Sequence, residues 1–92
     1  MSFDNNLDKA IKLNVKYPHQ FCTKNQDLLL KSDKCGCFYC GKIFSPTLIE
    51  EWIDEGETAL CPYCDIDSVI PEHEYYELNE KLLIEMGKHW FE

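Results

Sequence analysis

Apolar residues recur at helical spacing near both ends of the chain. Over residues 4–17 they follow a helical repeat with lysines on another face, and Pro18 is expected to end this helix at Tyr17. Over residues 72–91 they form one helical face, and Gly87 weakens the helix near its end. The members of that face are Tyr75, Leu78, Leu82, Leu83, Met86 and Trp90. The pattern therefore predicts an amphipathic helix at each end.

A shorter helix is predicted by its first residues. Thr23 and Gln26 have the spacing of a capping box, in which two side chains satisfy backbone donors at a helix start. Three consecutive leucines follow this pair. We therefore expect a short helix over residues 24–31.

The middle of the chain carries signals for one helix and two strands. Ser45 followed by proline is typical of a helix start, and Gly56 suits the position just after a helix end. Apolar and acidic residues between them separate onto two faces at helical spacing, so we expect a helix over residues 45–56. Residues 42–44 and 58–60 are strand candidates. We expect these two strands to pair, with the helix covering one face of the hairpin.

Two Cys-x2-Cys pairs are the strongest chemical signal in the sequence. Twenty residues separate the first pair, Cys37 and Cys40, from the second, Cys61 and Cys64. A two-residue gap lets both sulfurs of a pair turn toward one point, and two facing pairs supply four thiolates in a tetrahedron. Gly41 supplies the backbone freedom that such a tight turn needs. We therefore predict that these four cysteines bind one metal ion.

Zinc is the expected metal, because four soft thiolates in a tetrahedron are a common structural zinc site. A four-cysteine site is coordinatively closed and leaves no position for water or substrate, so we expect a structural ion and no enzymatic activity. Iron is the second possibility. The Cys-x2-Cys-Gly and Cys-Pro-x-Cys sequences resemble the knuckles of rubredoxin, which implies electron transfer. The chain departs from that pattern at Asp65, which stands where rubredoxin has glycine.

Other cysteines and histidines form no complete motif. His19, Cys22 and Cys35 would lack a fourth ligand for a second metal site, so we interpret them as ordinary packed residues. Cys35 could compete with Cys37 for the metal, but the two-residue spacing favours Cys37. The sequence from His73 begins like a zincin motif but lacks the second histidine, and we predict no catalytic residue.

Charge is distributed unevenly along the chain. The net charge is −8, and residues 1–49 carry seven lysines against four acids, whereas residues 50–92 carry two lysines against thirteen acids. We expect the acidic surface of residues 50–80 to meet a basic protein partner, because such a surface steers association. Charge reversal at four acidic residues tests this expectation, namely Glu50, Glu51, Asp54 and Glu55.

Nucleic-acid binding through the knuckles is an alternative function. Phe38, Tyr39 and Tyr63 are aromatic residues able to stack on bases. The acidic charge opposes contact with phosphates, and the chain has no arginine for reading guanine. Nucleic-acid binding is therefore disfavoured but left open.

The central stretch also resembles a known group of proteins. The stretches that carry the resemblance are Cys35 to Cys40, Phe44-Ser-Pro, Glu51 to Asp54, Thr58 to Cys64 and Ile66 to Val69. Together they look like small, uncharacterised bacterial or phage cytoplasmic proteins with a zinc-ribbon-like centre. The resemblance implies a metal site and a cytoplasmic location, and it adds no mechanism. The absence of a secretory signal and of a long apolar run also predicts a cytoplasmic protein without a membrane span.

The expected fold is α+β, a zinc-ribbon or rubredoxin-like pair of knuckles with a short β-hairpin and flanking helices. We expect a single zinc-binding domain over residues 1–92. Its parts are a helical N-terminal extension (1–34), a zinc-ribbon core (35–70) and a C-terminal helix (71–92). The partner and the oligomeric state are not specified by the sequence.

Overall fold

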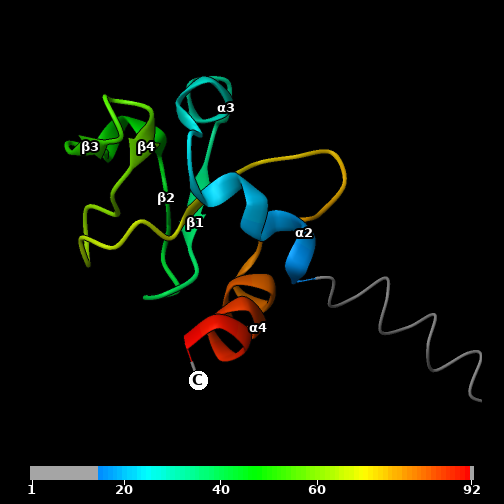
Figure 1. Ribbon diagram of the computed structural model, residues 1–92. Helices are drawn as coiled ribbons and strands as arrows, with labels where there is room; N and C mark the ends of the chain where they lie inside the picture. Colours follow the sequence, from blue (N-terminus) through cyan, green and yellow to red (C-terminus); the bar gives the residue numbers. More distant parts are fainter. Residues whose placement is uncertain (1–14, 92) are drawn as a thin grey trace, which may run out of the picture.

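The computed structural model describes residues 15–91, which form two small antiparallel sheets with short helices around them (Figure 1). The three-stranded sheet has β1 (Cys35–Cys37) at its centre, between β2 (Ile43–Phe44) and β5 (Val69–Pro71). Cys35 lies opposite Phe44 on one side and Pro71 on the other. The α+β class predicted from the sequence is confirmed.

The second sheet is a hairpin of β3 (Trp52–Ile53) and β4 (Thr58–Ala59). The helix predicted over residues 45–56 is therefore wrong. Ser45 does cap a helical turn, accepting a hydrogen bond from the Thr47 backbone N–H, but that turn is only the 3-10 helix η2 (Pro46–Leu48). An aromatic and a β-branched residue then favour a strand over a helix. Antiparallel pairing of these two residues with β4 stabilises the strand.

The turn of this hairpin uses left-handed backbone conformations at Asp54, Glu55 and Gly56, with φ values of 55°, 61° and 89°. Gly56 was expected to follow a helix end, a position that favours a positive φ. It does have a positive φ, but it lies in a hairpin turn. Asp54 also accepts a hydrogen bond of 2.8 Å from the Thr58 hydroxyl, which fixes the turn to β4. The acidic residues around this turn lie on the hairpin, not on a helix.

The two strands predicted over 42–44 and 58–60 exist as β2 and β4, but they do not pair with each other as expected. β2 pairs with β1, and β4 pairs with β3. The pairing of β1 with β5 was not predicted. Pro71 ends β5 at the edge of the sheet, a position where its missing N–H removes no ladder hydrogen bond.

Three short helices lead from residue 16 to the first sheet: α2 (Lys16–His19), η1 (Gln20–Cys22) and α3 (Gln26–Leu30). Most of the helix predicted over residues 4–17 lies outside the described residues. Pro18 was expected to follow a helix end, but it lies inside α2. It occupies the first turn, where a backbone N–H has no helical partner to lose.

α3 confirms the short helix expected over residues 24–31, but the capping box is wrong. The N-cap is Asn25, and its side chain makes no cap hydrogen bond. The fully buried Asn25 amide donates instead to the carbonyls of Phe21 and Val69, each at 2.9 Å, and its oxygen accepts from the Ala59 N–H at 3.2 Å. Asn25 thus connects η1 to β4 and β5.

The C-terminal helix α4 (Glu80–Phe91) is shorter than the predicted range of 72–91. The Asn79 side chain accepts a hydrogen bond of 2.9 Å from the Leu82 N–H and caps the helix there. Residues 72–79 form a loop, in which the Tyr76 hydroxyl donates to the Pro71 carbonyl. Gly36 lets α4 approach β1 closely, because a Cβ there would lie 2.8 Å from a Leu83 methyl.

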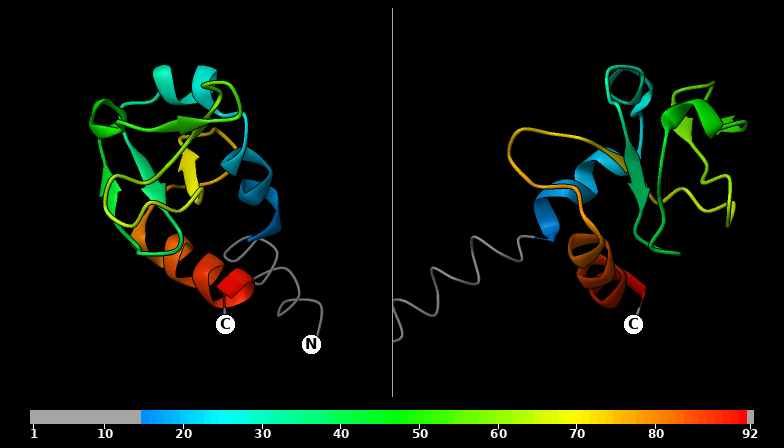
Figure 2. Two further views of the ribbon diagram at one scale, coloured as in Figure 1. Left: turned by 60° about the vertical axis from the view of Figure 1, so that its left-hand side comes forward. Right: turned by 180° about the vertical axis from the view of Figure 1, so that it is seen from behind.

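Two clusters of buried residues form the core. α3 and α4 lie at opposite ends of the three-stranded sheet, and the β3–β4 hairpin lies on the side away from α2 (Figure 2). α4 contributes Leu82, Leu83 and Met86 to one cluster. The other cluster, which includes the first cysteine of each Cys-x2-Cys pair, contains Leu29, Cys35, Cys37, Phe44, Ile49, Ala59, Cys61 and Val69. Within residues 15–91, no helix has the length and apolar character needed to cross a membrane.

Candidate metal centre

Each Cys-x2-Cys pair forms a tight turn with the same backbone pattern. Cys37 ends β1, and its carbonyl accepts a hydrogen bond of 2.8 Å from the Gly41 N–H. The Cys61 carbonyl accepts one of 2.9 Å from the Asp65 N–H. Gly41 and Asp65 both have a left-handed backbone, with φ of 81° and 64°. Asp65 therefore serves the second turn as glycine serves the first, because aspartate tolerates this region better than most residues.

The two turns bring the sulfurs of Cys37, Cys40, Cys61 and Cys64 within 4.8 Å of one another. The Cys37 and Cys64 sulfurs are 3.5 Å apart, and those of Cys40 and Cys61 are 3.7 Å apart. A tetrahedral ion with metal–sulfur bonds of about 2.3 Å places its ligand sulfurs about 3.8 Å apart. The cluster thus has the donor set and the spacing to hold one metal ion.

Hydrogen bonds inside the turns point backbone donors at the sulfurs. The N–H groups of Tyr39 and Cys40 both lie 3.4 Å from the Cys37 sulfur. In the second turn the Tyr63 N–H lies 3.4 Å from the Cys61 sulfur. Such donors favour the thiolate form that a metal requires, so the peptide backbone prepares both pairs for ligation.

Burial and hydrogen bonding act in opposite directions on these thiols. Burial raises the pKa of Cys61 to about 11 and also raises the pKa of Cys64. Burial likewise opposes ionisation of Cys37, but hydrogen bonds from Ser68, Cys40 and Tyr39 outweigh it and lower its pKa. A bound cation would hold all four sulfurs as thiolates, because its charge compensates theirs.

Ser68 contacts the cysteine cluster, a contact that the sequence analysis did not predict. Its hydroxyl lies 3.0 Å from the Cys37 sulfur, and its carbonyl accepts a 3.0 Å hydrogen bond from the Phe38 N–H. Ser68 is buried, so water does not compete for these contacts. It lies seven residues beyond Cys61 and comes beside Cys37 through the pairing of β1 with β5. A local cysteine motif gives no sign of this contact.

Cys35, Cys22 and His19 lie outside the four-sulfur cluster. Cys35 is fully buried in β1, where its thiol donates to the Phe44 carbonyl at 3.5 Å, and burial with nearby Cys61 and Cys37 raises its pKa to about 12. The Cys22 sulfur lies 4.0 Å from His19 Nε2. Among the described residues, none of these three side chains belongs to a group that could hold a metal ion.

His19 and His73 both lie against aromatic rings. His19 stacks on Trp90 with ring centroids 3.9 Å apart, and His73 stacks on Phe21 at 4.8 Å. His73 Nδ1 accepts a hydrogen bond of 3.2 Å from the Tyr75 N–H. His73 is thus a packed residue of the loop that precedes α4.

Comparisons with known proteins do not extend this description. No family model, no curated protein and no solved structure matches the chain. The four-cysteine cluster is consistent with the zinc-ribbon-like centre expected from the sequence.

Proposed function

We propose that the chain is a single zinc-ribbon-like domain in which one structural Zn²⁺, bound by Cys37, Cys40, Cys61 and Cys64, stabilises a non-enzymatic protein-interaction module. The observation that supports this most directly is the position of the four sulfurs. Cys37 and Cys61 are fully buried and belong to one core cluster, and Cys40 and Cys64 pack against it. The ion is thus part of the core, and its four thiolates leave no position for a substrate.

The acidic β3–β4 hairpin is the surface that we assign to the partner. Glu50, Glu51, Asp54 and Glu55 are exposed on or beside it. Within residues 15–91 the one ion pair is between Lys88 and Glu85, so these four carboxylates have no cationic partner there. A basic protein would supply the missing positive charge, and its association would weaken as salt rises.

An affinity pull-down from the native host at low and high salt tests this function. The variant is the double charge reversal Glu50→Lys with Glu51→Lys, which avoids Asp54 because that residue fixes the hairpin turn through Thr58. We expect the partner to be lost from the variant and from the wild type at high salt. The matched control makes the same charge change in the loop before α4.

That control is Glu74→Lys with Glu77→Lys, both exposed residues. It should retain the partner if the hairpin carries the interaction. Binding that ignores salt and persists in the hairpin variant would refute the proposal. Equal loss in both variants would show that net charge matters and the hairpin does not.

Nucleic-acid binding remains the second candidate, because the two knuckle tyrosines are open to solvent. Tyr39 is 55% exposed and Tyr63 is 53% exposed, and the Lys42 ammonium lies 5.4 Å from the centre of the Tyr63 ring. Exposed rings beside a cation suit the bases and phosphates of a single strand. A gel shift at low salt with the wild type and with Tyr39→Ala distinguishes this candidate from the protein-interaction module.

A further inference from the structure

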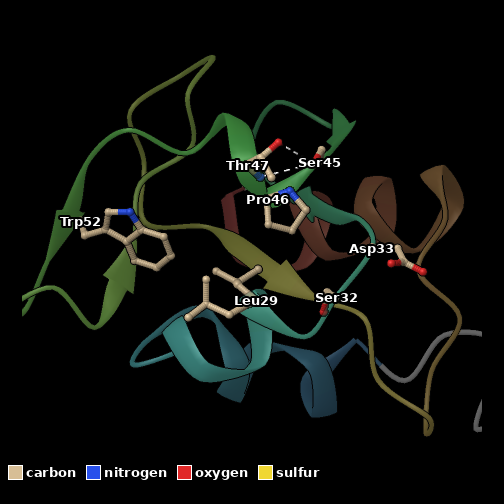
Figure 3. Close-up of a pocket in the computed structure, with 8 residues that line it drawn as sticks. Leu29, Ser32, Asp33, Ser45, Pro46, Thr47 and Trp52 are labelled. Carbon is tan, nitrogen blue, oxygen red and sulfur yellow. Dashed lines mark hydrogen bonds between the residues drawn. The ribbon is translucent and has the colours of Figure 1, made fainter.

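A pocket of about 260 Å³ opens between α3 and β3, and it involves none of the four clustered cysteines. The end of α3, the turn that follows it, η2 and β3 all contribute to its wall. Its lining residues are Leu29, Leu30, Ser32, Asp33, Ser45, Pro46, Thr47 and Trp52. Leu29 and Trp52 lie together toward one end, and Asp33 lies toward the other (Figure 3).

The end of the pocket near Trp52 is apolar. Leu29 is fully buried, and Trp52 is half-buried against the same core cluster. Leu30, at the rim, is 71% exposed although it is a leucine. Leu29, Leu30 and Trp52 thus give the pocket an apolar end that suits an apolar side chain of a ligand.

The other end carries one charge, that of Asp33. Asp33 is exposed, and its carboxylate has no hydrogen bond or ion pair within residues 15–91. Lys31 and Lys34 flank it in sequence, but neither lines the pocket. Charge complementarity therefore calls for a cation at this end of the pocket.

The turn that carries Asp33 is held in place by Glu72, the residue that follows β5. The Glu72 carboxylate accepts hydrogen bonds from the N–H groups of Asp33 at 2.7 Å and Lys34 at 3.1 Å. The Glu72 N–H in turn donates to the Ser32 hydroxyl at 3.1 Å. These bonds hold the backbone on both sides of Asp33, so the turn presents this residue at a fixed place on the pocket wall.

We propose that this pocket binds a short basic segment of the partner protein, with an apolar side chain against Leu29 and Trp52 and a neighbouring arginine at Asp33. This inference rests on the proposed function, because it names how the basic partner reaches the surface next to the acidic hairpin. Arginine suits the site better than lysine, since its planar guanidinium can pair with both carboxylate oxygens at once.

Tryptophan fluorescence tests the pocket with a peptide in place of the partner. The protein carries Trp90→Phe, so that Trp52 is its one tryptophan. The probe is the capped peptide acetyl-Gly-Leu-Arg-Gly-amide. We expect a saturable change in Trp52 emission, and a change lost when the leucine of the peptide is replaced by alanine.

Asp33→Asn should weaken this binding about fivefold, the effect of losing one exposed ion pair of roughly 1 kcal/mol. The matched control is Asp27→Asn, which removes the same charge from an exposed residue of α3 that does not line the pocket. It should leave binding unchanged. Equal effects of the two variants, or no saturable change in emission, would overturn the proposal.

The two proposals fail in different ways. A peptide that does not bind, together with a partner that is still lost from the Glu50→Lys, Glu51→Lys variant, would refute the pocket and leave the interaction module standing. A peptide that binds through Asp33, together with a partner indifferent to the hairpin charges, would support the pocket and refute the hairpin as the partner's contact.

Discussion

Removal of the proposed Zn²⁺ should unfold the chain. Structural zinc in four-ligand sites contributes an apparent binding free energy of about 10–16 kcal/mol at neutral pH. A domain of this size has a total stability of roughly 5–14 kcal/mol at about 0.05–0.15 kcal/mol per residue. Two of the four cysteines, Cys37 and Cys61, are fully buried in the same core cluster as Val69 and Ala59. The loss is therefore comparable to the whole stability.

Circular dichroism with and without a strong chelator measures this effect. We expect the near-ultraviolet signal of the aromatic residues and the cooperative thermal transition to disappear on chelation, and to return when Zn²⁺ is added in excess. Metal analysis of the purified protein should give one ion per chain. A red, iron-containing protein would point instead to a rubredoxin-like electron carrier.

Two cysteine variants separate the metal effect from cysteine chemistry in general. Cys40→Ser removes a ligand that is only half-buried, so its packing cost is small, and it should behave as the chelated protein does. Cys22→Ala is the matched control, because Cys22 lies outside the cluster and should leave metal content unchanged. A chelated protein with the same melting curve as the metal-loaded protein would refute the reasoning.

Three further predictions concern single residues. Ser68→Ala removes the hydroxyl 3.0 Å from the Cys37 sulfur and should speed zinc release to a chromogenic chelator about two- to tenfold, the effect of one hydrogen bond of roughly 0.5–1.5 kcal/mol; an unchanged rate would contradict the role of Ser68. Gly87→Ala would normally stabilise a helix by about 1 kcal/mol, but here a Cβ would lie 2.7 Å from the Phe38 carbonyl oxygen, so urea denaturation should show a loss of stability. Burial raises the pKa of Tyr76 above its ordinary value of 10.0, so the unfolded state releases this proton first and stability should fall as pH rises through 10.0; Tyr76→Phe should flatten that part of the pH profile.

The sequence specified the cysteine cluster because its signal is local. Each Cys-x2-Cys turn is fixed by its own backbone bonds, and Gly41 stands where a left-handed residue is needed. Asp65 looked like a departure from the knuckle pattern, but it adopts the same conformation as Gly41. The sequence shows that the two side chains differ, but it does not show that Gly41 and Asp65 share a left-handed backbone.

The elements that the sequence analysis predicted wrongly depend on contacts between residues far apart in the chain. The Ser45–Pro46 signal determined only one turn of helix, and nothing in it could specify that Trp52 would pair with Ala59. β1 pairs with β5 across more than thirty residues, so no local sequence pattern specifies this pairing. Ser68 reaches Cys37 through that same pairing, which explains why the sequence alone did not mark it.

The register of β1 and β5 has a consequence for the order of folding. It places Val69 opposite Cys37, so the sheet closes nearly the same loop of chain that a metal closes when it joins the two cysteine pairs. Either strand pairing or metal binding closes this loop first and carries the entropy cost of closure. The other then takes place in a chain whose loop is already closed. Strand pairing and metal capture should therefore be one cooperative step, in which a chain with a transiently formed sheet binds the ion faster than an extended one.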